Sequence, residues 1–150
     1  MPPVIRQCTF DELASAAGFD VLCAEYAAES GRLGLGAANV DPAFYRALES
    51  SGGAILGTWC DDSLIGFGAL TLSVLPNFSQ LIGCLTAIFI TASARKTGAG
   101  TAIRQAAEQI ARERGAVGMM ISAPSESRLD VILQRSSYRA THHVYFKGFQ

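Results

Sequence analysis

The sequence predicts a mixed α/β fold in which helices pack around a largely antiparallel sheet. Segments typical of strands and helices follow one another in the order β-α-α-β-β-β-α-β-α-β along 150 residues. This length fits one domain, which we expect to span residues 1–150. A hairpin pattern flanks the turn at residues 61–63. A strand–helix–strand unit over residues 81–122 predicts one parallel pair of strands.

The first part of the chain predicts a strand followed by two helices. Val4–Cys8 has the pattern of a short strand, and Asp11 is the expected cap of the segment after it. Asp20–Ser30 has a broad apolar helical face. Gly31–Asn39 contains three glycines within six residues and predicts a flexible loop. Residues 41–49 predict the next helix, because an aspartate N-cap is followed by proline in the first helical position.

Three strands are predicted in the middle of the chain. Ala54–Cys60 and Leu64–Val74 form the hairpin, and Leu81–Ile90 follows as a buried strand. The longest apolar stretches here, Leu64–Leu75 and Leu81–Ala94, are both well below the roughly 20 residues that a membrane span needs. Their β-branched and aromatic residues favour buried strands instead.

The C-terminal part carries the clearest helix. Thr101–Arg114 repeats apolar residues at helical spacing, and Gly115 stands where a helix end favours glycine. Val117–Ser122 predicts a buried strand, Ser127–Arg135 a second helix, and Tyr138–Phe149 the last strand or strands.

Composition and charge narrow the classes of function. Residues 1–75 hold nine acidic and three basic residues, whereas residues 76–150 hold four acidic and nine basic ones. This split is either ordinary solvated surface, or a basic half for an anionic cofactor with an acidic half that attracts a cationic substrate. The pI near 6.1 and the lack of an arginine-rich run argue against a general nucleic-acid binder.

The cysteines and the N-terminus predict a cytoplasmic protein. No apolar segment typical of a secretory signal follows the first methionine. No cysteine pair has the spacing of a metal site, so we expect buried free thiols in a reducing compartment and no metal. The cysteines are Cys8, Cys23, Cys60 and Cys84.

The chemically informative segment runs from the buried strand through a loop into the clearest helix. The first turn of a helix presents unpaired N–H groups and the positive end of the dipole, which favours phosphate. Gly98 and Gly100 lack the Cβ atoms that would keep a phosphate from the backbone, and Arg95 and Lys96 add positive charge. The segment therefore predicts a diphosphate site.

Two common diphosphate motifs do not fit. A P-loop requires lysine and then serine or threonine after its second glycine, whereas Thr101 and Ala102 follow Gly100. A dinucleotide-binding motif requires a glycine or alanine where Ile103 stands. A nucleotide-binding fragment, which would bind NAD, is thus disfavoured.

The pattern Arg95-x-x-Gly98-x-Gly100 resembles the Gln/Arg-x-x-Gly-x-Gly/Ala signature of the Gcn5-related N-acetyltransferase (GNAT) family. The order of elements resembles that family over nearly the whole chain, particularly its small phage and prophage members. Ser137 and Tyr138 stand where the family usually has Gly-Phe. The resemblance implies a GNAT fold with a mixed, mostly antiparallel sheet of six or seven strands and about four helices.

The resemblance also implies an activity and a cofactor site. Acetyl would pass from acetyl-CoA to an amine by direct attack in a ternary complex. The backbone of Ile88 and Ile90 would pair with the pantetheine arm, beside a slot where this strand splays from the next, and Ser125 is a weaker candidate for contacts there. Seven consecutive residues would hold the pyrophosphate: Arg95, Lys96, Thr97, Gly98, Ala99, Gly100 and Thr101.

The sequence departs from the family at the catalytic positions. Many relatives carry a glutamate in the strand before the signature, where Thr86 is the nearest polar residue here. The tyrosine that protonates the thiolate in many relatives is replaced by Leu133, and the usual helix-starting asparagine by Glu126. These losses favour a rival hypothesis, a catalytically weak domain that binds CoA as a regulatory or interaction module.

Other residues are open to two interpretations. His142, in the predicted last strand, is either a base that reaches the slot or an ordinary surface or core histidine. His142 and Thr86 are therefore the candidate catalytic residues. Tyr26 and Tyr45 either line an acceptor pocket or belong to the core. The expected partners are a small-molecule or peptide amine, cationic by the charge split, and a second copy of the chain, with neither nucleic acid nor membrane.

Overall fold

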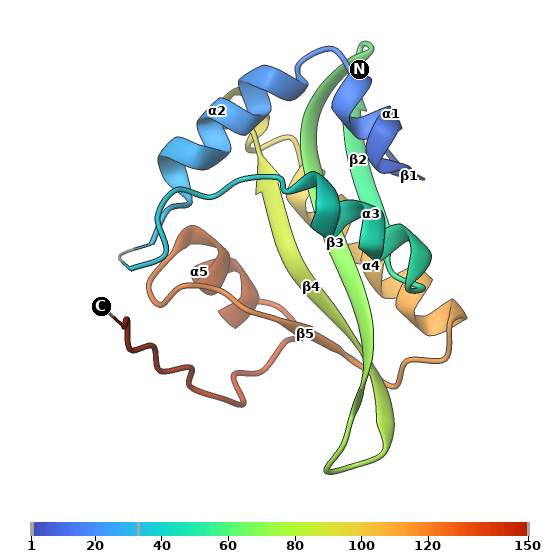
Figure 1. The fold of residues 1–150 in the computed structure, drawn as a ribbon, viewed down its shortest axis with the longest axis vertical. Coiled ribbons are helices and arrows are strands. Elements are labelled where there is room, and N and C mark those ends of the chain that lie inside the picture. Colours follow the sequence, from blue (N-terminus) through green and yellow to red (C-terminus); the bar gives the residue numbers. More distant parts are fainter. Residues whose placement is uncertain (1, 33, 150) are drawn as a thin grey trace.

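The computed structural model describes residues 2–32 and 34–149. Through α5 its elements follow the predicted order, with an additional short helix near the N-terminus and a 3₁₀ helix after the fourth strand (Figure 1). In chain order they are β1 (Val4–Cys8), α1 (Phe10–Ser15), α2 (Phe19–Glu29), α3 (Pro42–Ser50), β2 (Ala54–Cys60), β3 (Ser63–Leu75), β4 (Gln80–Ile90), the 3₁₀ helix η1 (Ala92–Ala94), α4 (Ala99–Glu113), β5 (Met119–Ile121) and α5 (Arg128–Gln134).

The five strands form one mixed sheet in the order β1-β2-β3-β4-β5. Strands β1 to β4 pair with one another in antiparallel fashion. Strand β5 is parallel to β4, as the strand–helix–strand unit predicted. The sheet is thus mixed and mostly antiparallel, with fewer strands in the described part of the chain than the expected six or seven.

Helices cover both faces of the sheet. Ile55 and Leu56 are neighbours in β2 and point to opposite faces, because side chains alternate along a strand. Ile55 joins a cluster with apolar residues of α1, α2 and α3. Leu56 joins a second cluster with Ile103 and Ala107 of α4. The long helix after the glycine-containing loop therefore lies against the face opposite to α1–α3.

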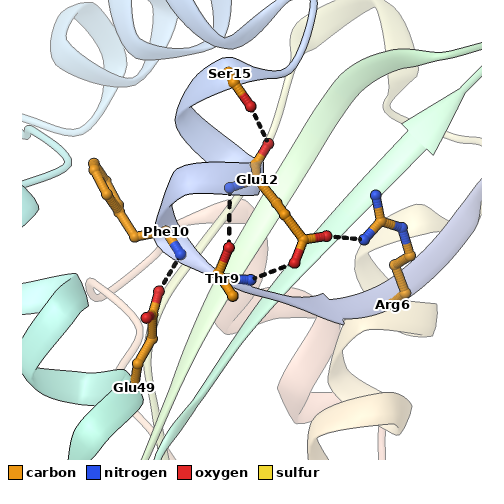
Figure 2. A network of polar contacts seen from close by, with 6 residues as sticks. All are labelled: Arg6, Thr9, Phe10, Glu12, Ser15 and Glu49. Carbon is orange, nitrogen blue, oxygen red and sulfur yellow. Dashed lines mark hydrogen bonds and ion pairs between the residues drawn. The ribbon is translucent and has the colours of Figure 1, made fainter.

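The start of α1 differs from the prediction. Thr9, not the expected Asp11, caps the helix through a capping box in which its hydroxyl accepts from the Glu12 amide while the Glu12 carboxylate accepts from the Thr9 amide. Figure 2 shows this network, in which Arg6 pairs with Glu12 and the Glu49 carboxylate of α3 accepts from the Phe10 amide. Local capping thus joins α1 to both β1 and α3.

The predicted last strand is not present. Residues 137–149 form neither helix nor strand, and Figure 1 shows them as an irregular trace near α5. Val144, Tyr145 and Phe149 are at least 84% exposed. The β-branched and aromatic residues here favour a strand, but an extended segment becomes a strand only when its backbone pairs with a neighbouring edge. The prediction for Tyr138–Phe149 was therefore wrong.

The described part of the chain contains no helix that is both long and apolar enough to span a membrane. None of the four cysteines forms a disulfide bond within the described residues. Burial raises the pKa of the Cys8 thiol to about 12.

Candidate functional site

The glycine-containing segment follows β4, as predicted, and runs into the first turn of α4, which begins two residues before the predicted Thr101. After β4 the chain makes the turn η1 and then a loop, and α4 begins at Ala99. Gly98 is the N-cap of α4 and adopts a left-handed conformation with φ of 85°. Because glycine has no side chain, this N-cap does not offer the first helical amides the acceptor that Ser, Thr, Asp or Asn would supply.

The amides at this helix start are largely unpaired. The Ala102 amide makes the first α-helical bond, to the Gly98 carbonyl at 3.0 Å. Among the described residues, the Gly100 and Thr101 amides have no hydrogen-bond acceptor. The Ala99 amide reaches the Thr97 hydroxyl at the long distance of 3.4 Å. Such N–H groups, together with the helix dipole, form a site that accepts an anion.

The two glycines leave open space in front of these amides. A Cβ atom added to Gly98 would meet nothing within 4 Å, and one added to Gly100 would meet only Ile90 Cγ1, at 3.8 Å. Packing within the described chain therefore does not require glycine at either position. The left-handed φ explains Gly98, whereas neither the backbone conformation nor packing within the described chain explains a glycine at position 100.

Strand β4 has a free backbone edge next to the loop. Its parallel pairing with β5 ends at Leu85, so residues 86–90 have no partner strand on that side within the described part of the chain. The Thr91 amide bonds to the Ile65 carbonyl on β3. Because bonded pairs alternate in an antiparallel ladder, the backbone groups of Ile88 and Ile90 face away from β3, toward the free edge. An extended arm is able to pair there as an added strand.

A small pocket of about 70 Å³ lies where the pairing between β4 and β5 ends. Its lining is mostly apolar and comes from β4, β5, α4 and α5: Leu85, Ile88, Gly100, Thr101, Arg104, Ile121, Leu129 and Ile132. A larger and more open pocket of about 480 Å³ lies at the other edge of the sheet, on β1 and β2, with Glu12 and Glu49 at its wall. The small pocket is the one that adjoins both the free edge of β4 and the start of α4.

Arg95 and Lys96, the predicted cations of the loop, differ in their contacts. Arg95 Nε donates to the Ile90 carbonyl at 3.0 Å, and the guanidinium forms an ion pair with Glu29 of α2. The side chain of Arg95 is therefore held by protein groups. Lys96 is exposed, with a left-handed φ of 74°. Ser125 is also exposed, in the turn before α5.

The candidate catalytic residues differ in position. Thr86 is the extra residue of a bulge in β4, and its hydroxyl donates to the Ala69 carbonyl at 3.2 Å. His142 is exposed in the irregular C-terminal segment, with its Nδ1 2.6 Å from the Thr141 hydroxyl. No strand carries His142 toward the small pocket, so the predicted placement was wrong. Leu133, at the family's tyrosine position, is buried.

Tyr26 and Tyr45 belong to the core. Tyr45 is buried, with its ring centroid 6.1 Å from that of Phe67, and Tyr26 is half-buried with its ring 5.2 Å from those of Phe67 and Phe89. The Tyr138 hydroxyl donates to Glu108 of α4. Burial and this carboxylate raise the pKa of Tyr138 above its usual value.

Comparisons with known proteins identify the family and the fold of the chain. The model of the acetyltransferase (GNAT) family matches residues 22–129. No curated protein matches the sequence. Solved structures match at low identity over nearly the whole chain. One, a ribosomal-protein-alanine N-acetyltransferase from Brucella melitensis biovar Abortus 2308, has a TM-score of 0.76 and 19% identity, and covers 99% of this chain and 100% of its own.

Two further structures show the same fold. A putative acetyl transferase from Pyrococcus furiosus has a TM-score of 0.74 and 17% identity, and covers 98% of this chain and 99% of its own. AAC(6')-Iy, in complex with the bisubstrate analog CoA-S-monomethyl-acetylneamine, has a TM-score of 0.73 and 18% identity, and covers 100% of this chain and 99% of its own.

Proposed function

The chain belongs to the acetyltransferase (GNAT) family, whose members use acetyl-CoA, and on that premise we propose that residues 95–101 hold the pyrophosphate while acetyl passes to an amine. The observation that carries the proposal is the start of α4, where open space over Gly98 and Gly100 faces the unpaired amides of Gly100 and Thr101. An anionic group that enters this space gains both hydrogen bonds and the helix dipole.

The free edge of β4 supports a place for the rest of the cosubstrate. The outward-facing backbone groups of Ile88 and the amide of Ile90 are suited to bind an extended pantetheine arm, whereas the Ile90 carbonyl already accepts from Arg95. The small pocket beside them would receive the thioester end, because its mostly apolar lining excludes water from the reacting carbonyl. Ser125 stays a candidate for contacts near the arm.

The proposed chemistry is direct attack in a ternary complex. The amine nitrogen bonds to the carbonyl carbon of the thioester, the carbon–sulfur bond breaks, and the proton lost by nitrogen ends on the thiolate or in water. No carboxylate lines the small pocket within the described residues. Positioning therefore supplies most of the acceleration, and the acceptor must arrive as the neutral amine.

This chemistry sets a pH dependence. Turnover should rise with pH until the acceptor ammonium has lost its proton, since only the neutral amine attacks. The midpoint should thus move with the pKa of the amine when acceptors of different basicity are compared in a thiol-release assay. A midpoint that stays fixed across acceptors would show instead that a group of the protein acts as the base.

The acidic first half of the chain supports a cationic acceptor, either a small-molecule or a peptide amine. AAC(6')-Iy was solved with an acetylneamine analog, and the Brucella protein is named for a ribosomal-protein alanine. We expect amines that carry a positive charge on a group other than the reacting nitrogen to be turned over faster than amines of equal size without such a charge. Equal turnover of the two sets would contradict this preference.

A second candidate function is a CoA-binding module with little or no turnover. Two observations favour it: the Thr86 hydroxyl donates to a backbone carbonyl and so is no base, and Leu133 replaces the tyrosine of many relatives. Saturable CoA binding with no thiol release from any amine would support the module and exclude the transferase. A single-domain organisation, a homodimer and a cytoplasmic location stay predictions.

A further inference from the structure

Two glutamates of α2 hold the loop before α4 from its outer side. Glu25 Oε2 accepts a hydrogen bond from the Ala92 amide at 3.0 Å. Glu29 forms an ion pair with Arg95. The two glutamates are four residues apart on one helix, so their side chains leave the same face of α2. Figure 1 shows α2 lying beside the end of β4, where this loop begins.

Arg95 connects this contact to the sheet. Its Nε donates to the Ile90 carbonyl, and its guanidinium lies 5.4 Å from the centre of the Phe89 ring. The side chains of Arg95 and Glu29 are 30% and 40% exposed, so the pair is partly shielded from water. The guanidinium is thus held between a carboxylate of α2 and the last residues of β4, which fixes both ends of the turn η1.

This anchoring matters because backbone amides bind an anion only when the loop that carries them keeps its shape. We propose that Glu25 and Glu29 are positioning residues that hold the pyrophosphate loop in its binding conformation without contacting CoA. The inference rests on the proposed function. It also assigns the side chain of Arg95 a different role from the predicted one: the guanidinium neutralises Glu29 and anchors the loop, and only the backbone of Arg95 remains available to the phosphates.

The test compares two ligands that differ in their phosphates. NMR titrations would measure the dissociation constants of CoA and of pantetheine, which has no phosphate. In the Glu25→Gln/Glu29→Gln variant we expect the dissociation constant of CoA to rise about tenfold, and that of pantetheine to stay within about twofold. The matched control is Asp20→Asn, which removes one carboxylate from an exposed position of the same helix. It should leave both constants unchanged.

A second measurement follows the loop without any ligand. The Ala92 amide should exchange with solvent faster in Glu25→Gln than in the unaltered protein, because the variant weakens its hydrogen bond. This single variant keeps the ion pair of Glu29 and provides the readout if the double variant does not fold.

Three results would overturn the inference. Unchanged CoA affinity would show that the loop holds its shape without the glutamates. Tighter CoA binding would show that released Arg95 binds the phosphates. An equal loss for CoA and pantetheine would show general damage to the fold. Failure of the unaltered protein to bind CoA is a distinct result, because it would refute the proposed function itself.

Discussion

At the scale of single residues, Gly98 and Gly100 are glycines for different reasons. Gly98 caps α4 with φ of 85°, which other residues adopt only with strain. Gly100 has no such conformation, and only Ile90 Cγ1 lies within 4 Å of its added Cβ position. Sequence reasoning selected both positions through the motif, but only the structure separates the backbone requirement at Gly98 from the open space at Gly100.

Thr86 gives a prediction at this scale. Its hydroxyl donates to the Ala69 carbonyl in the bulge of β4, so its role is in the backbone geometry of the strand. Thr86→Val should lower the free energy of unfolding by about 1 kcal/mol and leave kcat within about twofold. Urea unfolding and the thiol-release assay would measure the two effects. A large fall in kcat with unchanged stability would contradict this structural role and indicate that Thr86 takes part in catalysis.

At the scale of elements, the helix starts show how local signals compete. The sequence gives two possible caps for α1, and Asp11 is the wrong one because the capping box of Thr9 and Glu12 satisfies two amides at once. Asp41 was correctly predicted for α3, where no competing pair precedes the proline. The start of a helix is thus predictable when a single capping signal is present.

The cap of α1 can be tested directly. Thr9→Ala should destabilise the protein by about 1 kcal/mol, because the Glu12 amide loses its acceptor. Asp11→Ala removes only an exposed ion pair with Arg46 and should cost less than about 0.5 kcal/mol. Thermal or urea unfolding of the two variants gives the comparison. A larger effect of Asp11→Ala would contradict the capping box.

The ends of the sheet show that the pattern of apolar residues along the sequence does not predict which strands pair. The pattern over Tyr138–Phe149 measures a preference for extended structure, while a strand also needs a free edge at the right distance. Strand β5 is also shorter than predicted, because its pairing with β4 stops at Leu85. Sequence reasoning therefore predicted the four antiparallel strands and α4 well, and failed where long-range pairing decides the outcome.

At the scale of the whole molecule, the candidate site depends on where β5 ends beside β4. The pairing of these two strands stops at Leu85, which leaves a free edge of β4 next to the signature loop and the small pocket. The motif predicted the loop after β4, whereas the splay of the two strands that the family resemblance implies stays a prediction. The contacts of Glu25 and Glu29 with the loop were missed, since residues more than sixty positions apart carry no local signal.

The most direct test of the account is a calorimetric titration of CoA into the unaltered protein and into Gly100→Val. We predict saturable binding to the unaltered protein and an affinity at least about tenfold lower for Gly100→Val, since the added side chain enters the space over the helix amides. Gln105→Val, an exposed position of the same helix, should bind like the unaltered protein. Absence of binding to the unaltered protein, or equal affinity in Gly100→Val, would contradict the central claim that the start of α4 holds the pyrophosphate.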